Sequence, residues 1–175
     1  MKKSNKRYIL ETVTAALLIA LKIVLDRFMS YNVWNQRFGF AFVATAFAAA
    51  ILGAPWAMAV AGIGDVLGAL LFPSGAYFPG FTLTAVLTAG CTAFFIHKNA
   101  TPIRVALSVI INQIFGSVLL NSLWISVLYG KGYIALLPGR IVQAGIMTVL
   151  QTVLTYFLFG DKSPVKRQLI KFYAV

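Results

Sequence analysis

The sequence contains few side chains that could support acid–base or metal chemistry. Its 175 residues include four Asp or Glu residues, one His and one Cys, against 15 Lys or Arg residues. Metal sites need clustered His, Cys, Asp or Glu, and neither His97 nor Cys91 has a carboxylate close to it in the sequence. A Gly-rich phosphate loop followed by Lys-Ser or Lys-Thr is also absent. We therefore expect no catalysis and no ATP hydrolysis by this chain, and no metal or cofactor site.

Other polar side chains are of the kinds that bind a ligand. Several lie within or beside long apolar segments, where a buried polar group is costly and is therefore a candidate for function. Together they predict an outward-facing pocket with aromatic walls, a few amides, one carboxylate and a cationic mouth. A ligand with a flat, hydrogen-bonding ring and an anionic end would suit this pocket. The candidate substrate-binding residues are Arg27, Arg37, Asp65, Tyr77, Phe78, Asn121, Trp124, Lys131, Arg140 and Gln143.

Each candidate also has a structural interpretation, which the sequence leaves open. Asp65 could pair with an arginine inside the bundle, and Asn121 could form a hydrogen bond between helices. Arg27 and Lys131 could be anchors at the membrane interface. Arg140 directly follows a Pro-Gly pair, where an irregular helix start is expected to line a cavity. Two deeper amides are interpreted as packing contacts, namely Asn112 and Gln113.

The composition indicates which elements must hold these residues. Hydrophobic residues make up 60% of the chain and charged residues 11%, with a mean hydropathy of +0.86. This argues against a soluble enzyme, in which roughly 25% of residues are charged, and against a nucleic-acid-binding protein. We predict an all-α polytopic membrane protein: a single transmembrane domain over residues 1–175 that forms a compact bundle in the lipid bilayer. Its six transmembrane helices are expected at residues 8–28, 38–53, 56–72, 81–96, 103–128 and 134–159, followed by a basic cytoplasmic tail at 161–175.

The distribution of positive charge predicts the orientation in the membrane. The formal net charge is +11, and ten of the 15 Lys and Arg residues fall on the side of the two termini. Four fall on the other side, and Lys22 lies within the first predicted helix. Because Lys and Arg accumulate in cytoplasmic segments, we expect both termini in the cytoplasm.

The first predicted helix also carries two small residues four positions apart, Ala16 and Ala20. Small residues at this spacing form a flat face that another helix can approach closely. The pattern alone leaves open whether this face binds a partner or packs internally. The same spacing occurs elsewhere, in Ala57/Ala61, Gly64/Gly68 and Ala85/Ala89.

A small six-helix chain that lacks ATPase machinery and carries this first-helix pattern resembles the substrate-binding S components of energy-coupling factor (ECF) vitamin transporters. The general likeness covers nearly the whole chain, and four strings are most similar to the folate-specific member. The most distinctive is LNSLWISVLYGK at residues 120–131. The others are GDVLGALLFP at 64–73, FPGFTLTA at 78–85 and LLPGRIVQ at 136–143.

The resemblance implies a multi-pass protein of the bacterial plasma membrane that captures folate, or a related vitamin, from outside with high affinity. It also implies partners: one transmembrane coupling subunit and two ATPase subunits that import the vitamin. In this family picture, Ala16 and Ala20 match the motif that packs on the coupling subunit. The alternatives are an S component for riboflavin, thiamine or biotin, or a membrane subunit that does not transport.

The chemistry of folate agrees with the candidate pocket. Asp65 or an amide such as Asn121 could accept hydrogen bonds from the pterin ring, and Trp124, Phe78 or Tyr77 could stack on its face. The glutamate tail carries carboxylates, which arginine binds through paired hydrogen bonds. The cations that match this tail are Arg27, Arg37, Lys131 and Arg140.

Overall fold

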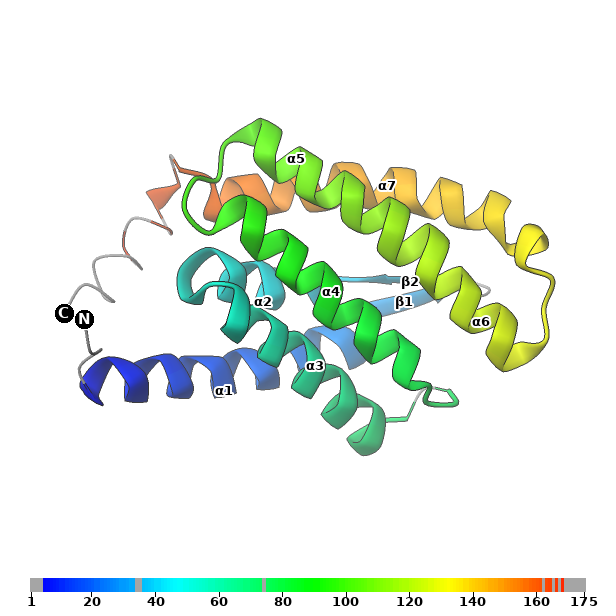
Figure 1. Ribbon diagram of the computed structural model, residues 1–175, viewed down its shortest axis with the longest axis horizontal. Coiled ribbons are helices and arrows are strands. Elements are labelled where there is room, and N and C mark those ends of the chain that lie inside the picture. Colours follow the sequence, from blue (N-terminus) through cyan, green and yellow to red (C-terminus); the bar gives the residue numbers. More distant parts are fainter. Residues whose placement is uncertain are drawn as a thin grey trace.

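A computed structural model gives the fold of the chain (Figure 1). It describes residues 5–33, 36–73, 75–161, 163, 164, 166 and 168, with the backbone alone for residues 31–33, 36 and 37. The predicted basic tail therefore lies largely outside the described residues. In chain order the elements are α1 (Asn5–Arg27), β1 (Ser30–Val33), β2 (Gln36–Gly39), α2 (Phe42–Phe47), the π-helix η1 (Ala48–Leu52), α3 (Ala54–Leu71), α4 (Pro79–Ile96), α5 (Pro102–Ile111), the π-helix η2 (Asn112–Asn121), α6 (Ser122–Tyr129) and α7 (Tyr133–Phe159).

Five helices within the described residues are long and apolar enough to cross a membrane: α1, α3, α4, the continuous helix α5–η2–α6, and α7. Their bounds lie within a few residues of five of the predicted spans. Proline stands in the first turn of α3, α4 and α5, where its missing N–H is not needed and its fixed φ favours the helix. The chain is therefore a helical membrane protein, as its composition predicted.

The second predicted span, residues 38–53, requires a correction. Residues 36–39 pair with residues 30–33 in an antiparallel hairpin, with Ser30 opposite Gly39 and Val33 opposite Gln36. The all-α expectation thus lacked a small two-stranded sheet, in which residues 36–39 are extended rather than helical. The helix that follows, Phe42–Leu52, is about 16 Å long at 1.5 Å per residue. It is too short to cross a hydrocarbon layer of about 30 Å.

The corner at Gly53, in the sequence Gly-Ala-Pro, ends this short helix. Gly53 has φ 92° and ψ −175°, a backbone region that glycine alone readily adopts. The ring of His97, at the end of α4, lies directly against it: a Cβ on Gly53 would be 3.2 Å from His97 Cε1. The chain can therefore turn sharply here and begin α3 at Ala54.

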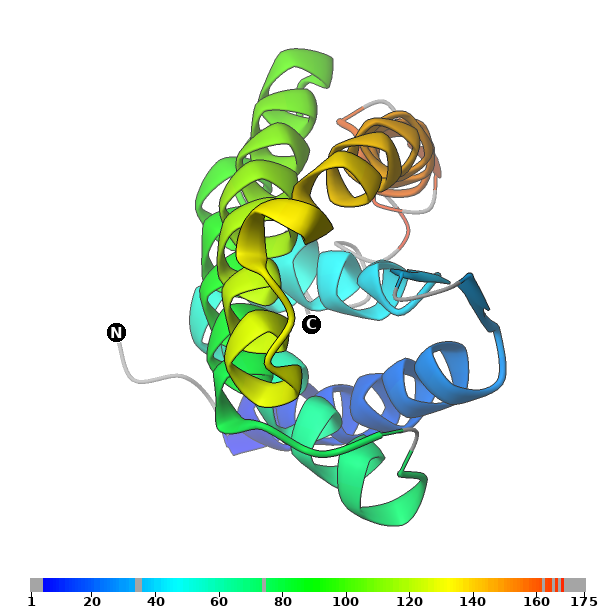
Figure 2. The ribbon, with the colours of Figure 1, turned by 90° about the vertical axis from the view of Figure 1, so that its right-hand side faces the viewer.

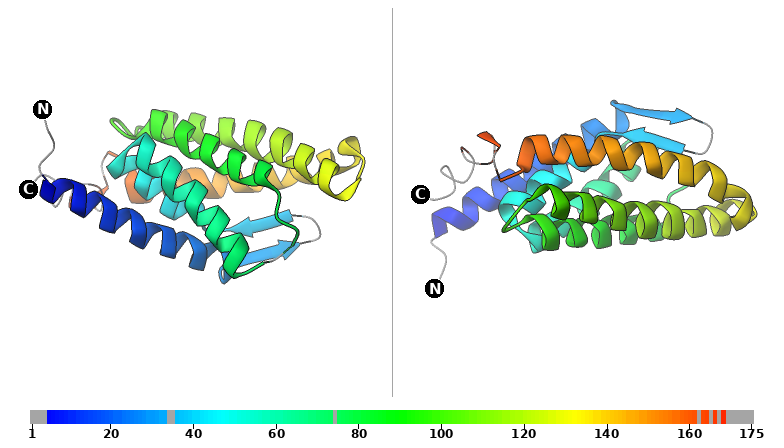
Figure 3. Two further views of the ribbon diagram at one scale, coloured as in Figure 1. Left: turned by 60° about the horizontal axis from the view of Figure 1, so that its bottom comes forward. Right: turned by 90° about the horizontal axis from the view of Figure 1, so that it is seen from above.

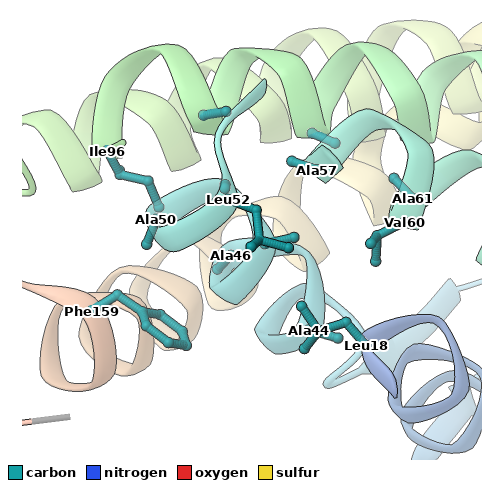
Figure 4. Close-up of a cluster of buried hydrophobic side chains, with 14 of the residues drawn as sticks. Leu18, Ala44, Ala46, Ala50, Leu52, Ala57, Val60, Ala61, Ile96 and Phe159 are labelled. Carbon is teal, nitrogen blue, oxygen red and sulfur yellow. The ribbon is translucent and has the colours of Figure 1, made fainter. Parts of the chain in front are cut away.

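The core of the bundle is built largely from alanine (Figure 4). Ala44, Ala48 and Ala49 on α2 and η1 are completely buried. Leu18 of α1 and Phe159 of α7 belong to the same buried cluster. Small side chains let helix backbones approach closely, so the alanine-rich segment lies inside the bundle rather than facing lipid.

The arrangement of the elements places α2 at the centre. It contacts α1, α3, α4 and α7 and lies among them in the end-on view (Figure 2). The hairpin bridges two long helices, because β1 contacts α1 and β2 contacts α7 (Figure 3). α1 begins and α7 ends at the same end of the bundle (Figure 1), which agrees with termini on one side of the membrane.

A polar contact fixes the end of α7 to the connection between α4 and α5. The carboxylate of Asp161 accepts hydrogen bonds from the Ala100 N–H at 2.8 Å and from Lys166 Nζ at 2.9 Å. Partial burial opposes ionisation of Asp161, but the bonds from Lys166 and Ala100 outweigh it and lower the pKa of this carboxyl. The contact therefore stabilises the fold while Asp161 is ionised.

Candidate ligand-binding cavity

A cavity of about 520 Å³ lies inside the bundle, beside the alanine-rich core. Side chains from α1, α2, α3, α4, α5, η2, α6 and α7 line it, together with residues 75–77 before α4. Apolar walls come from residues such as Ala61, Phe81 and Met147. Hydroxyls, amides and charged groups interrupt these walls, so the cavity is amphiphilic, as the sequence predicted.

Five charged side chains line the cavity: Lys22, Asp26, Arg27, Asp65 and Arg140. Lys22 and Arg140 are each 7% exposed. Arg27 Nε lies 3.7 Å from Asp26 Oδ2. Three cations and two carboxylates leave one excess positive charge among the described lining residues. Because an uncompensated charge is costly away from water, this charge balance favours an anionic ligand.

Asp65 is fixed by hydroxyl groups. Thr82 Oγ1 donates to Asp65 Oδ2 at 2.6 Å, and the Tyr77 hydroxyl lies 3.0 Å from Thr82 Oγ1. This chain of contacts joins α3 to α4 and to the connection between them. Within the described residues, Arg27 pairs with Asp26 rather than with Asp65, so the structural interpretation of Asp65 as an internal ion-pair partner finds no support there.

Three threonines on α4 form a polar stripe along the cavity: Thr84, Thr88 and Thr92. Their spacing of four places them on one face of the helix. Each hydroxyl donates to a backbone carbonyl four residues earlier, at 2.8–3.0 Å. The oxygens then serve as acceptors, for Trp124 Nε1 at 3.0 Å on Thr84 and for Asn112 Nδ2 at 2.7 Å on Thr92.

The π-helix η2 turns a row of polar side chains into the cavity. Asn112, Gln113 and Asn121 all line it. Residues nine apart in an α-helix point about 180° away from each other, so Asn112 and Asn121 would face opposite sides. The wider turn of a π-helix, which often occurs at functional sites, brings both to the same cavity. The side-chain oxygen of Asn121 is buried and accepts no hydrogen bond within the described residues.

The interpretation of Asn112 and Gln113 as packing contacts was incomplete. Asn112 does bond to Thr92, and Gln113 Nε2 does donate to Gln151 Oε1 at 3.1 Å. Both amides nevertheless line the cavity as well. The π-helical turns place them there. Because the spacing of apolar residues does not reveal π-helical turns, the sequence could not predict that these two amides line the cavity.

On α7, Arg140 and Gln143 are buried and line the cavity. Met147 and Gln151 continue the same row, at the spacing that follows one helix face. The irregular helix start expected near Arg140 is not present: Pro138 lies inside α7, which begins at Tyr133 and continues to Phe159. Arg140 therefore reaches the cavity from a regular helix.

The ten predicted binding residues fall into three groups: an aromatic pair that packs together, two cations that are not among the described lining residues, and six residues that line the cavity. Phe78 and Trp124 pack together with ring centroids 5.5 Å apart, and Trp124 supports the cavity wall through its bond to Thr84. Lys131 is exposed between α6 and α7, and the side chain of Arg37 lies outside the described residues. Six line the cavity, namely Arg27, Asp65, Tyr77, Asn121, Arg140 and Gln143. The prediction omitted several polar lining residues, among them Lys22, Asp26 and Gln151.

The pair of small residues on α1 lies on a different surface. Ala16 and Ala20 are both exposed, next to Leu17, which is 66% exposed. By contrast, Ala57 and Ala61 on α3 have the same spacing but are completely or almost completely buried. The first pair is therefore available to another helix, whereas the second already packs inside the chain.

Comparison with known proteins identifies the family. Residues 10–159 match the ECF transporter substrate-specific component. The chain belongs to this family. The match over residues 10–159 agrees with the resemblance of the four sequence strings, and the family is that of a transporter component rather than an enzyme.

Two relatives of this S component are each named folate transporter FolT. The protein from Clostridium novyi is 34% identical over 160 residues, which cover 90% of this chain and 93% of the relative. The protein from Leuconostoc mesenteroides is 33% identical over 157 residues, covering 86% and 84%. A crystal structure of FolT bound with folic acid has a TM-score of 0.80 and 32% identity, and covers 85% of this chain and 91% of that one.

Arg140 provides the first test of the cavity. Arg140→Ala should weaken binding of folic acid, the ligand in the similar solved structure. A lost charged hydrogen bond costs about 1.5–3 kcal/mol, or roughly 10- to 150-fold in Kd. Calorimetric titration of the purified protein in detergent measures this change. Ile141→Ala, at the neighbouring position that is 59% exposed, is the matched control. Unchanged affinity in a folded Arg140→Ala protein would show that Arg140 does not contribute to ligand binding.

Proposed function

We propose that this chain is the folate-binding S component of an ECF-type importer. The observation that carries the proposal is its similarity, over most of both chains, to a FolT structure that holds folic acid. The two FolT relatives support the same ligand. In this role the chain captures the vitamin outside the cell and delivers it through partner subunits that hydrolyse ATP.

The lining of the cavity agrees with the groups of folate. The buried oxygen of Asn121 is an acceptor for the donor pair of the pterin ring. An unpaired acceptor is costly when buried, so a ligand N–H at Asn121 would remove that cost. Lys22, Arg27 and Arg140 supply positive charge for the glutamate carboxylates. Tyr77 and Phe81, both in the lining, offer aromatic surface to a flat ring.

The family and its bacterial relatives support a bacterial plasma-membrane location, and the charge distribution supports an orientation with both termini in the cytoplasm. Lys and Arg favour the cytoplasmic side, and ten of them fall on the side of the termini. With this orientation, residues 75–77 and Arg27 lie near the outer face. The cavity then opens toward the medium from which the vitamin is taken.

The exposed face of α1 at Ala16 and Ala20 is the surface we assign to the transmembrane coupling subunit. Flat faces of small residues drive helix association in lipid, where the hydrophobic effect gives no preference. Exposed Val13, Leu17 and Val24 extend this apolar face along α1. The two ATPase subunits would act through the coupling subunit.

Ligand identity is tested by titration. The purified protein should bind folic acid and should not bind riboflavin, thiamine or biotin at comparable concentrations. The physical reason is the combination of a cationic cavity with acceptors for a pterin. Isothermal calorimetry provides the measurement. Binding of one of the other vitamins without folic acid would keep the family but reject the ligand, and binding of none would favour a subunit that does not transport.

Ala16→Leu with Ala20→Leu tests the coupling surface. The added side chains would keep a partner helix at a distance, so assembly with the coupling subunit and uptake of labelled folate should be lost while folic acid binding is unchanged. Co-purification and whole-cell uptake are the measurements. Ala135→Leu, an exposed alanine on α7, is the control and should change neither. Loss of ligand binding together with assembly would show that the α1 face packs internally.

A further inference from the structure

Two glycines on α3 make room for charged side chains rather than for a helix backbone. A Cβ on Gly64 would lie 2.9 Å from Cδ of Lys22, a distance that real Cβ atoms do not tolerate. A Cβ on Gly68 would lie 3.3 Å from Nε and 3.4 Å from Nη2 of Arg27. Because residues four apart share one helix face, the two glycines form a passage along α3 for two side chains of α1.

Lys22 uses this passage to reach the ligand cavity. Its side chain lines the cavity, and the residue is more than nine-tenths buried, at 7% exposure. A lysine near the end of a helix would ordinarily extend toward water. A charged side chain that instead lies inside a membrane protein is a functional candidate, and none of the sequence motifs had identified this one.

We propose that Lys22 acts with Arg27 in binding a carboxylate of the ligand, and that Gly64 and Gly68 are the positions that let both side chains enter the cavity. This inference rests on the proposed function. Lys22 and Arg27 are five residues apart on α1, an axial rise of about 7.5 Å. They are about 140° apart around the helix axis, but both side chains lie against one face of α3 and line the same cavity, so they can approach one anion between them.

The charges that line the cavity as a whole favour an anionic ligand. Asp26 lies next to Arg27, and Asp65 accepts its bond from Thr82. The cavity retains one more cation than carboxylates among the described lining residues, and a ligand carboxylate would balance that charge. The pair also provides specificity against thiamine, which carries a positive charge, and against riboflavin, which has no carboxylate. Biotin carries a carboxylate, so its exclusion depends on the acceptors for the pterin ring.

The experiment compares folic acid with its dimethyl ester, which keeps the pterin ring but has no charged carboxylate. Both are titrated by calorimetry into the wild-type chain, Lys22→Met, Gly64→Ala and the double variant. Lys22→Met retains an unbranched apolar side chain, so the bundle should fold. Gly145→Ala is the matched control, because nothing lies within 4 Å of a Cβ at that exposed helical position.

Lys22→Met should weaken folic acid binding by about tenfold or more, the effect of losing a charged hydrogen bond, and should leave ester binding within about twofold. Gly64→Ala should act in the same direction and add nothing in the Lys22→Met background, because both changes remove one interaction. Gly145→Ala should bind both compounds as the wild type does.

Two results separate the possible failures. A wild-type chain that binds neither compound would reject the proposed function itself. A wild-type chain that binds folic acid, with a Lys22→Met variant that weakens folic acid and ester equally, would show that Lys22 supports the fold and would overturn the inference alone. Additive losses in the double variant would show that Gly64 acts on something other than Lys22.

Discussion

Charged groups inside a membrane bundle must be kept away from lipid, and this constraint organises the molecule. Lys22, Arg27 and Arg140 come from the first and last long helices, yet all three line one cavity. Isolated charges at such depth cost several kcal/mol each. Collecting them around a polar interior, where the carboxylates of Asp26 and Asp65 partly balance them, lowers that cost; we propose that a ligand anion balances the remaining charge.

The rest of the fold makes space for this interior. The short helix α2–η1 fills one half of the bundle with alanine, so that the surrounding helices pack tightly there. Beside it, threonines on α4 and the π-helical turns of η2 line the cavity, and glycines on α3 make room for the side chains of Lys22 and Arg27. A tightly packed half thus provides rigidity, and a polar half provides recognition. The tight packing depends on small alanine side chains. The cavity depends on glycines and on π-helical turns, which leave space for polar groups.

Much of this could be predicted from the sequence. Long apolar segments predicted five spanning helices closely, and isolated polar residues such as Asp65 and Arg140 correctly indicated a polar cavity. The hairpin at residues 30–39 was missed because its apolar end continues directly into the α2 sequence. Asn112 was undervalued because the periodicity of an α-helix turns it away from Asn121, and only π-helical turns unite them. Lys22 was missed because its passage depends on glycines of another helix.

The most direct measurement is an experimental structure of this chain, in lipid or detergent, with saturating folic acid. The account predicts density for one folate inside the cavity, with the pterin ring near Asn121 and a carboxylate within hydrogen-bonding distance of the α1 cations. An empty cavity with folate bound at another surface of the bundle would contradict it, even if the affinity were high.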